Sequence, residues 1–186
     1  VGIFDISHMG IIDVTGDDAT AYLDYITTND CRTLADGKAL YSVLCNERGG
    51  IIDDIFIYRY SDDRYRLIVN ASNREKDYAW LVSHMSSWLV NVSDVSEPYA
   101  LFAIQGPHAA HVLETAWHFS LDQLSYHSFC HRTCNGRDIF IATTGYTGEY
   151  GCEVMFLRND ASDVFKELMD AGASYGMQPI GFGARD

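Results

Sequence analysis

Strand-like runs that follow one another in neighbouring groups constrain the fold of this chain most strongly. Runs rich in β-branched and aromatic residues are typical of strands. Single helix-like segments separate groups of these runs instead of alternating with every one, which disfavours a regular parallel βαβ winding. We therefore predict an α+β fold of mixed, mainly antiparallel sheets with flanking helices, and we recognise no internal repeat. The predicted strands cover residues 3–14, 40–45, 51–60, 64–69, 99–105, 139–144 and 152–157.

Four segments carry the signals of amphipathic helices. The first covers about residues 17–28, and the second follows Ser72 and Glu75, whose spacing is that of a capping box. Pro107 suits the first turn of a third helix, and Asp160 or Ser162 could cap a fourth. The apolar faces predicted to be buried are Ala19, Tyr22, Leu23 and Ile26 in the first helix, Tyr78, Leu81, Val82, Met85 and Leu89 in the second, and Val164, Phe165, Leu168 and Met169 in the last.

The charge balance of the chain excludes some kinds of partner. Thirteen basic residues stand against 26 acidic ones, for a formal net charge of −13. Binding to nucleic acid needs a basic surface that displaces counterions, and binding to an anionic membrane needs a similar attraction. We therefore expect neither nucleic acid nor a membrane as a partner. The five cysteines suggest no dense disulfide framework, which favours a reducing compartment such as the bacterial cytoplasm or the mitochondrial matrix.

Asp53 and Asp54 stand near the start of a strand-like run that is otherwise apolar. Successive side chains of a strand point to opposite faces, so the two carboxylates are predicted not to share one pocket. Asp54 falls on the face of Phe56 and Tyr58, where a carboxylate must be paired, hydrogen-bonded or neutralised. Residue chemistry alone leaves open, and even favours, a structural role in which Asp54 accepts hydrogen bonds from the turn at 49–50.

Glu153 poses the same question in a second strand-like run. Alternation places it beside Met155 and Leu157, on a face that would line a core or a cleft. A carboxylate held there could accept two adjacent N–H donors from an amidine-like edge. The simpler interpretation is a glutamate that reaches solvent or pairs with an arginine.

Glycines at 145, 148 and 151 mark a loop that could shape a ligand site. A loop that cradles phosphates leads into a helix N-terminus and usually carries a lysine. Here a strand-like run follows and the loop contains no lysine, so we reject a nucleotide site.

Two histidines and two cysteines between His127 and Cys134 could ligate zinc by residue type. Structural zinc sites usually take ligand pairs from two separated segments. On a strand, His127 and His131 would face away from Cys130 and Cys134. We therefore predict no metal, and interpret the segment as strand residues that lead into the turn at 135–136.

Taken together, motifs in a fixed order resemble the aminomethyltransferase family, and most closely the T-protein type of the glycine cleavage system. The resemblance covers essentially the whole chain, and no single motif is specific without the others. The motifs are FDISHMG at 4–10, TND at 28–30, YS at 41–42, NERGGIIDD at 46–54, NA at 70–71, QGP at 105–107, TGYTGE at 144–149 with Gly151 and Glu153, and ARD at 184–186.

The resemblance implies a reaction and a set of site residues. A lipoylated carrier, the H-protein, would deliver an aminomethyl group; ammonia leaves, and tetrahydrofolate N5 takes up the methylene, giving 5,10-methylenetetrahydrofolate and reduced lipoate. Asp54 would be the catalytic carboxylate beside folate N5, and Glu153 would hold the amino-pyrimidine edge of the pterin. The remaining folate-binding candidates are Tyr41, Tyr58, Val69, Asn70, Tyr146 and Arg185.

The same resemblance implies what the chain lacks and which relatives compete with the main interpretation. Members of the family extend beyond both ends of this sequence, so we expect residues 1–186 to form one folate-binding domain, shortened at both ends and without the C-terminal barrel domain. The alternatives are a folate-dependent demethylase, the folate domain of an enzyme that oxidises dimethylglycine or sarcosine, and a folate-binding module without catalysis.

Overall fold

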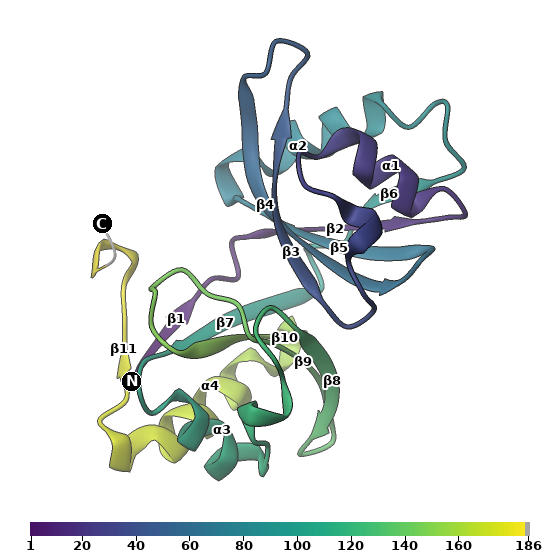
Figure 1. The fold of residues 1–186 in the computed structure, drawn as a ribbon. Coiled ribbons are helices and arrows are strands. Elements are labelled where there is room, and N and C mark those ends of the chain that lie inside the picture. The colour runs from purple at the N-terminus through teal and green to yellow at the C-terminus, as the bar shows by residue number, and fades with distance from the viewer. Residues whose placement is uncertain (185–186) are drawn as a thin grey trace. The chain divides into compact units, whose positions relative to one another are not determined.

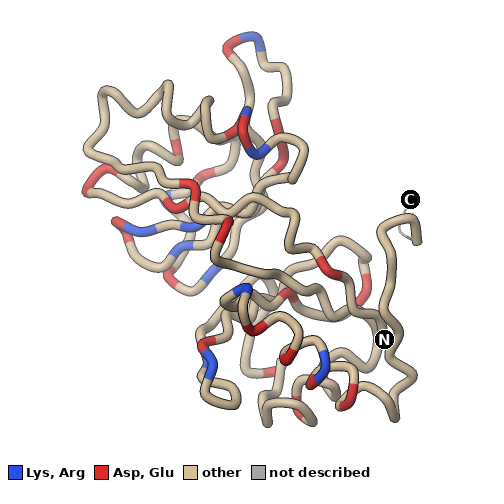
Figure 2. Tube along the Cα trace, turned by 180° about the vertical axis from the view of Figure 1, so that it is seen from behind, with Lys and Arg blue, Asp and Glu red and all other residues tan. Residues whose placement is uncertain are grey.

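The computed structural model describes residues 1–184, and these divide into two compact units (Figure 1). Unit 2 is the continuous segment Met9–Ser96. Unit 1 combines Val1–His8 with the chain from Glu97 onward. Within residues 1–184, no helix is long and apolar enough to cross a bilayer. Acidic positions occur throughout both units (Figure 2).

Unit 2 contains a five-stranded sheet in the order β3-β4-β5-β2-β6, with all neighbouring strands antiparallel. One face of the sheet packs against α1 and α2, because Tyr22 and Leu23 of α1 and Leu81 of α2 join Ile55 and Ile57 of β4 in one apolar core. The elements are β2 (Gly10–Thr15), α1 (Ala19–Ile26), β3 (Ala39–Cys45), β4 (Ile51–Ser61), β5 (Arg64–Val69), α2 (Arg74–Ser83) and β6 (Asn91–Asp94), with short 3₁₀ turns η1 (Cys31–Thr33) and η2 (Ala71–Asn73).

Unit 1 contains a six-stranded sheet in the order β11-β1-β7-β10-β9-β8, antiparallel except for the β1–β11 pair. Its core joins Val112 of α3 and Leu168 of α4 to Val154 of β10, so both helices cover one face (Figure 1). The elements are β1 (Gly2–Asp5), β7 (Tyr99–Gln105), α3 (Ala109–Trp117), β8 (Phe129–Cys134), β9 (Arg137–Ala142), β10 (Gly151–Leu157), α4 (Ala161–Gly172) and β11 (Gln178–Pro179), with 3₁₀ turns η3 (Leu121–Gln123), η4 (Arg158–Asp160), η5 (Ala173–Tyr175) and η6 (Phe182–Ala184).

The two units repeat one chain path, which the sequence did not reveal. In each, a strand, a helix, a 3₁₀ turn, three strands, a second helix and a last strand follow in this order, and β3-β4-β5-β2 corresponds to β8-β9-β10-β7 in the sheets. The turn into the first helix is also shared: Gly16 (φ +132°) and Gly106 (φ +125°) each accept a hydrogen bond from an alanine three residues later. The repeat is one of backbone geometry, with few identical side chains to signal it.

The predicted α+β class is confirmed, but two predicted elements are wrong in detail. The run 3–14 forms two strands in different sheets. Where β1 separates from β7, the Ser7 hydroxyl donates a hydrogen bond to the Leu101 carbonyl oxygen and accepts one from the Leu101 backbone N–H. The second helix ends at Ser83, before Met85 and Leu89, and Leu89 is 70% exposed. Its buried positions are Asp77 and Leu81, one turn apart. Ser72 makes no cap there, since the N-cap is Asn73, without a side-chain cap bond.

Candidate functional site

Asp54 is held by a hydroxyl and an amide on the helix-free face of the unit 2 sheet. Tyr41 on β3 donates its hydroxyl to Asp54 Oδ2 at 3.0 Å, and Asn70 Nδ2 donates to Oδ1 at 3.1 Å. The antiparallel register pairs Tyr41 with Phe56, so the tyrosine ring reaches along the face to Asp54. The Asp54 side chain is half-buried. The result is a carboxylate with fixed orientation that still has access to a ligand.

Asp53 points to the other side of β4, as strand alternation predicts, and is almost completely buried. It accepts hydrogen bonds from the Asn70 backbone N–H at 3.0 Å, from Asn70 Nδ2 at 3.0 Å and from Asn73 Nδ2 at 2.5 Å. Burial opposes its ionisation, but hydrogen bonds from Asp77, Asn70 and Asn73 outweigh burial and lower the pKa of Asp53. The two carboxylates face opposite ways, yet the single Asn70 amide contacts both.

The turn at 49–50 does not use Asp54. Asn46 Oδ1 accepts the backbone N–H groups of Arg48 at 2.9 Å and Gly50 at 3.0 Å. The structural role that residue chemistry favoured for Asp54 is therefore filled by another side chain.

The predicted aromatic neighbours lie on the expected face, whereas Val69 does not. The Phe56 ring centroid lies 5.5 Å from that of Tyr41 and 6.2 Å from that of Tyr58. Val69 pairs with Ile55, and both side chains belong to the core beneath the helices. Its side chain is fully buried on the opposite side of the sheet, so any contact from Val69 to a ligand beside Asp54 would have to involve its backbone.

Glu153 is a buried carboxylate on the helix-free face of the unit 1 sheet. It is only 5% exposed, and its Oε2 accepts a hydrogen bond from Thr144 Oγ1 at 2.6 Å. Cys152 and Val154, its neighbours in β10, belong to the core under α3 and α4, so Glu153 points the other way. Met155 is buried beside it, while Leu157 is 55% exposed and lies outside the predicted cluster. Glu153 therefore does not reach solvent, which was one of the two options in the simpler interpretation.

The glycine-bearing loop joins β9 to β10 as a hairpin and is anchored on Gln105. Thr147 donates its hydroxyl to Gln105 Oε1 at 2.8 Å, and Gln105 Nε2 donates to the Cys152 carbonyl oxygen at 3.2 Å. A Cβ at Gly151 would lie 2.2 Å from the Ile104 carbonyl oxygen, so only glycine lets the strands approach there. Tyr146 is half-buried in this loop. The loop lines a shallow hollow of about 270 Å³ together with Leu124, Tyr126 and His127.

The remaining candidates have simpler outcomes. Arg185 lies outside the described residues. His131 Nδ1 lies 3.2 Å from a carboxylate oxygen of Asp138, and Cys134 is buried in the core. Within residues 1–184, no three His, Cys, Asp or Glu side chains gather as a metal site would require.

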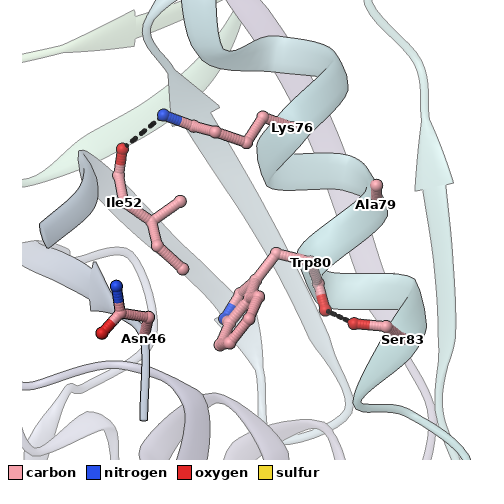
Figure 3. Close-up of a pocket in the computed structure, with 6 residues that line it drawn as sticks. All are labelled: Asn46, Ile52, Lys76, Ala79, Trp80 and Ser83. Carbon is pink, nitrogen blue, oxygen red and sulfur yellow. Dashed lines mark hydrogen bonds between the residues drawn. The ribbon is translucent and has the colours of Figure 1, made fainter. Parts of the chain in front are cut away.

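Another hollow belongs to unit 2 and lies between α2 and the beginning of β4 (Figure 3). Its lining is mostly apolar and includes none of the predicted site residues. Lys76 closes one side by donating to the Ile52 carbonyl oxygen at 2.8 Å. The lining residues are Asn46, Ile52, Lys76, Ala79, Trp80 and Ser83.

The sequence-based prediction missed two members of the Asp54 network, Asn73 and Asp77, and also the connecting role of Asp53. The spacing of Asn73 and Asp77 was a usable signal, because residues four apart lie on one face of a helix and Asn73 is the N-cap of α2. The prediction gave that face to apolar residues instead, and so left the buried acid out.

Comparison with known proteins identifies the family of this chain. Residues 1–186 match the family described as the GCVT N-terminal domain. An aminomethyltransferase of Thermotoga petrophila is 44% identical over 186 residues, which cover all of this chain and 51% of that protein. The Flavobacterium psychrophilum aminomethyltransferase is 43% identical over 187 residues, covering 52% of its length. The chain thus spans about half the length of the curated relatives it matches.

Solved structures give the same result. The glycine cleavage system aminomethyltransferase T from Bartonella henselae superposes with a TM-score of 0.89 at 35% identity, covering all of this chain and 49% of that one. The heterotetrameric sarcosine oxidase from Corynebacterium shares the fold at 12% identity, with a TM-score of 0.71 over 96% of this chain and 87% of that one. The match along the whole sequence, together with the close structural agreement, shows that the chain belongs to the GCVT N-terminal domain family.

Proposed function

We propose that the full-length protein containing this chain is a tetrahydrofolate-dependent aminomethyltransferase of the glycine cleavage system. It would take the aminomethyl group from the lipoyl arm of the H-protein, release ammonia and leave the methylene on folate. The observation that carries this proposal is the half-buried Asp54 carboxylate, fixed by Tyr41 and Asn70 in a member of the GCVT N-terminal domain family.

Asp54 suits an electrostatic role better than a proton-transfer role. Each of its oxygens already accepts a hydrogen bond, so the carboxylate is held as a charged acceptor in one orientation. A fixed negative charge stabilises the positive charge that develops at folate N5 as it takes up the methylene. It also orients that nitrogen toward the incoming carbon.

Glu153 suits recognition of the pterin ring. A nearly buried carboxylate has two oxygens with several acceptor sites, which match the adjacent N–H donors of an amino-pyrimidine edge. Tyr41, Tyr58, Asn70 and Tyr146 are proposed as further folate contacts, and Val69 only through its backbone. Folate is a substrate in this proposal, and no metal takes part.

Asp54→Asn separates catalysis from binding. The variant keeps the shape and a hydrogen-bonding group but loses the charge, so kcat should fall by roughly 10²-fold while the Kd for tetrahydrofolate stays within about 3-fold. The control is Asp63→Asn, which removes a carboxylate near the turn between β4 and β5. Normal turnover by Asp54→Asn would refute the proposed role.

Glu153→Gln should show the opposite pattern. Loss of a charged hydrogen-bond acceptor is expected to weaken tetrahydrofolate binding by roughly 10-fold to 100-fold in Kd. Isothermal titration calorimetry measures it, with the exposed Glu114→Gln as control. An unchanged Kd would contradict the pterin assignment.

The donor is decided by parallel assays of the full-length protein. Aminomethylated H-protein, dimethylglycine and a methylated sulfonium compound are each offered with tetrahydrofolate, and the folate products are separated by chromatography. Methylenetetrahydrofolate with ammonia from the H-protein arm alone supports the proposal. Product from another donor alone would replace it with the demethylase or oxidase alternative.

A further inference from the structure

A second carboxylic acid lies buried behind the Asp54 network. Asp77, on α2, is fully buried, and among residues 1–184 no N–H or O–H group donates to either of its carboxyl oxygens. Buried carboxylates normally receive several donors, because leaving one charged and unpaired is costly. The Asp53 carboxyl group on β4 acts on the ionisation of Asp77, and the two side chains can share a hydrogen bond once one of them is protonated.

Such a pair requires a shared proton. Two carboxylates have only acceptor oxygens, so a hydrogen bond between them forms only when one is protonated. Asp53 already accepts bonds from Asn70 and Asn73, which favour its charged form. The proton therefore belongs on Asp77, whose oxygens receive no hydrogen-bond donor within residues 1–184.

The charges around the pair agree with this assignment. Burial, followed by the hydrogen bond to Asp53 and the charge of Asp53, raises the pKa of Asp77 to about 8, and Asp54 adds to the effect. Lys76 opposes it but directs its ammonium to the Ile52 carbonyl oxygen and to Asn73 Oδ1. One turn earlier on α2, Arg74 is occupied by Asp94 of β6 at 2.7 Å.

We propose that Asp77 is a positioning residue for Asp54, acting as a neutral acid that donates its proton to Asp53 and so fixes the Asn70 amide between the two aspartates. Asn70 Nδ2 lies 3.0 Å from Asp53 Oδ1 and 3.1 Å from Asp54 Oδ1, so the orientation of one amide depends on the first carboxylate and sets the second. The importance of this network for catalysis rests on the proposed function; the proton on Asp77 does not.

We expect the Asn70 amide to lose its fixed orientation at alkaline pH. When Asp77 ionises, two buried negative charges repel each other, and Asp53 no longer keeps the geometry that holds Asn70. Asp54 then loses one of its two fixed donors. We expect kcat to fall as the pH rises through about 8, with a smaller change in KM for folate.

The test compares two variants of the full-length protein. Asp77→Asn replaces the O–H donor with an N–H donor that cannot ionise, so its kcat should stay within about 3-fold of wild type at neutral pH and lose the alkaline decline. Asp77→Leu removes the donor, and its kcat should fall by roughly 10-fold, a larger effect than the change in KM. An alkaline decline that persists in Asp77→Asn would overturn the proposal.

A second measurement needs neither folate nor turnover. The side-chain ¹⁵N–¹H₂ signals of Asn70 and the ¹³C carboxyl signal of Asp77 are followed against pH by NMR. In wild type, the Asn70 and Asp77 signals should shift together at about pH 8. In Asp77→Asn, the Asn70 signals should be independent of pH. If Asp77 titrates like an ordinary aspartic acid, the proposal is wrong even for an active enzyme. Coupled titration in a protein without aminomethyltransferase activity would instead keep the network and reject only the proposed function.

Discussion

Removing the ionisable group at Asp77 should change how the stability of unit 2 depends on pH. The pKa of Asp77 is raised from the ordinary value of 3.8 to about 8, so between these values the unfolded chain releases a proton that the folded chain keeps. The contribution of Asp77 to the free energy of unfolding is therefore fully present below about pH 4 and is lost as the pH rises toward about 8. The slope is about 1.4 kcal/mol per pH unit, or about 2.7 kcal/mol between pH values two units apart.

Asp77→Asn cancels this slope, because an amide does not titrate in the range. Hydrogen exchange of peptides covering Ile51–Ser61 and Arg74–Ser83, measured near pH 5 and near pH 7, gives the local opening free energy in both proteins. The difference in opening free energy between wild type and variant should change by about 2.7 kcal/mol between the two pH values, with the variant relatively more stable at the higher pH. Other titrating groups are common to both proteins and cancel.

Two controls make the result specific to Asp77. Glu75→Gln removes a negative charge from the exposed side of the same helix and should leave the wild-type slope in place. Asp53→Asn supplies a neutral donor to Asp77, which should lower the pKa of Asp77 and flatten the slope as well. Parallel curves for wild type and Asp77→Asn would refute the buried neutral acid.

Two further predictions test the frame around the site. Thr144→Val deletes the hydrogen-bond donor to Glu153 and should destabilise the protein by about 1–3 kcal/mol in thermal unfolding. Thr144→Ser keeps a hydroxyl and should retain most of this stability. Equal effects of the two variants would argue against the hydrogen bond. Gly16→Ala places a Cβ 2.2 Å from the Leu89 carbonyl oxygen at a φ of +132° and should cost more than about 1–2 kcal/mol in urea unfolding. Gly49→Ala has a positive φ but an open surrounding, so it should cost less.

The sequence by itself determined the class of the fold, most strand positions and the family. Strand and helix periodicity are local properties, so β4, β5 and β10 lie within a residue or so of the predicted runs. Strand alternation also separated Asp53 from Asp54 correctly, because it depends only on the geometry of a single strand. The ordered motifs then identified the family that the comparisons establish.

Only the tertiary structure decided which groups complete the site. Asn70 and Asn73, which precede α2, reach Asp53 over 17 and 20 residues of sequence, and no local pattern specifies such a contact. Val69 was proposed because the family resemblance implied a cleft residue there, but the pairing of β4 with β5 turns its side chain into the core. The ionisation of Asp77 depends on burial and on the carboxylate beside it. Burial and neighbouring charges are properties of the folded environment, and the residue type alone does not determine them.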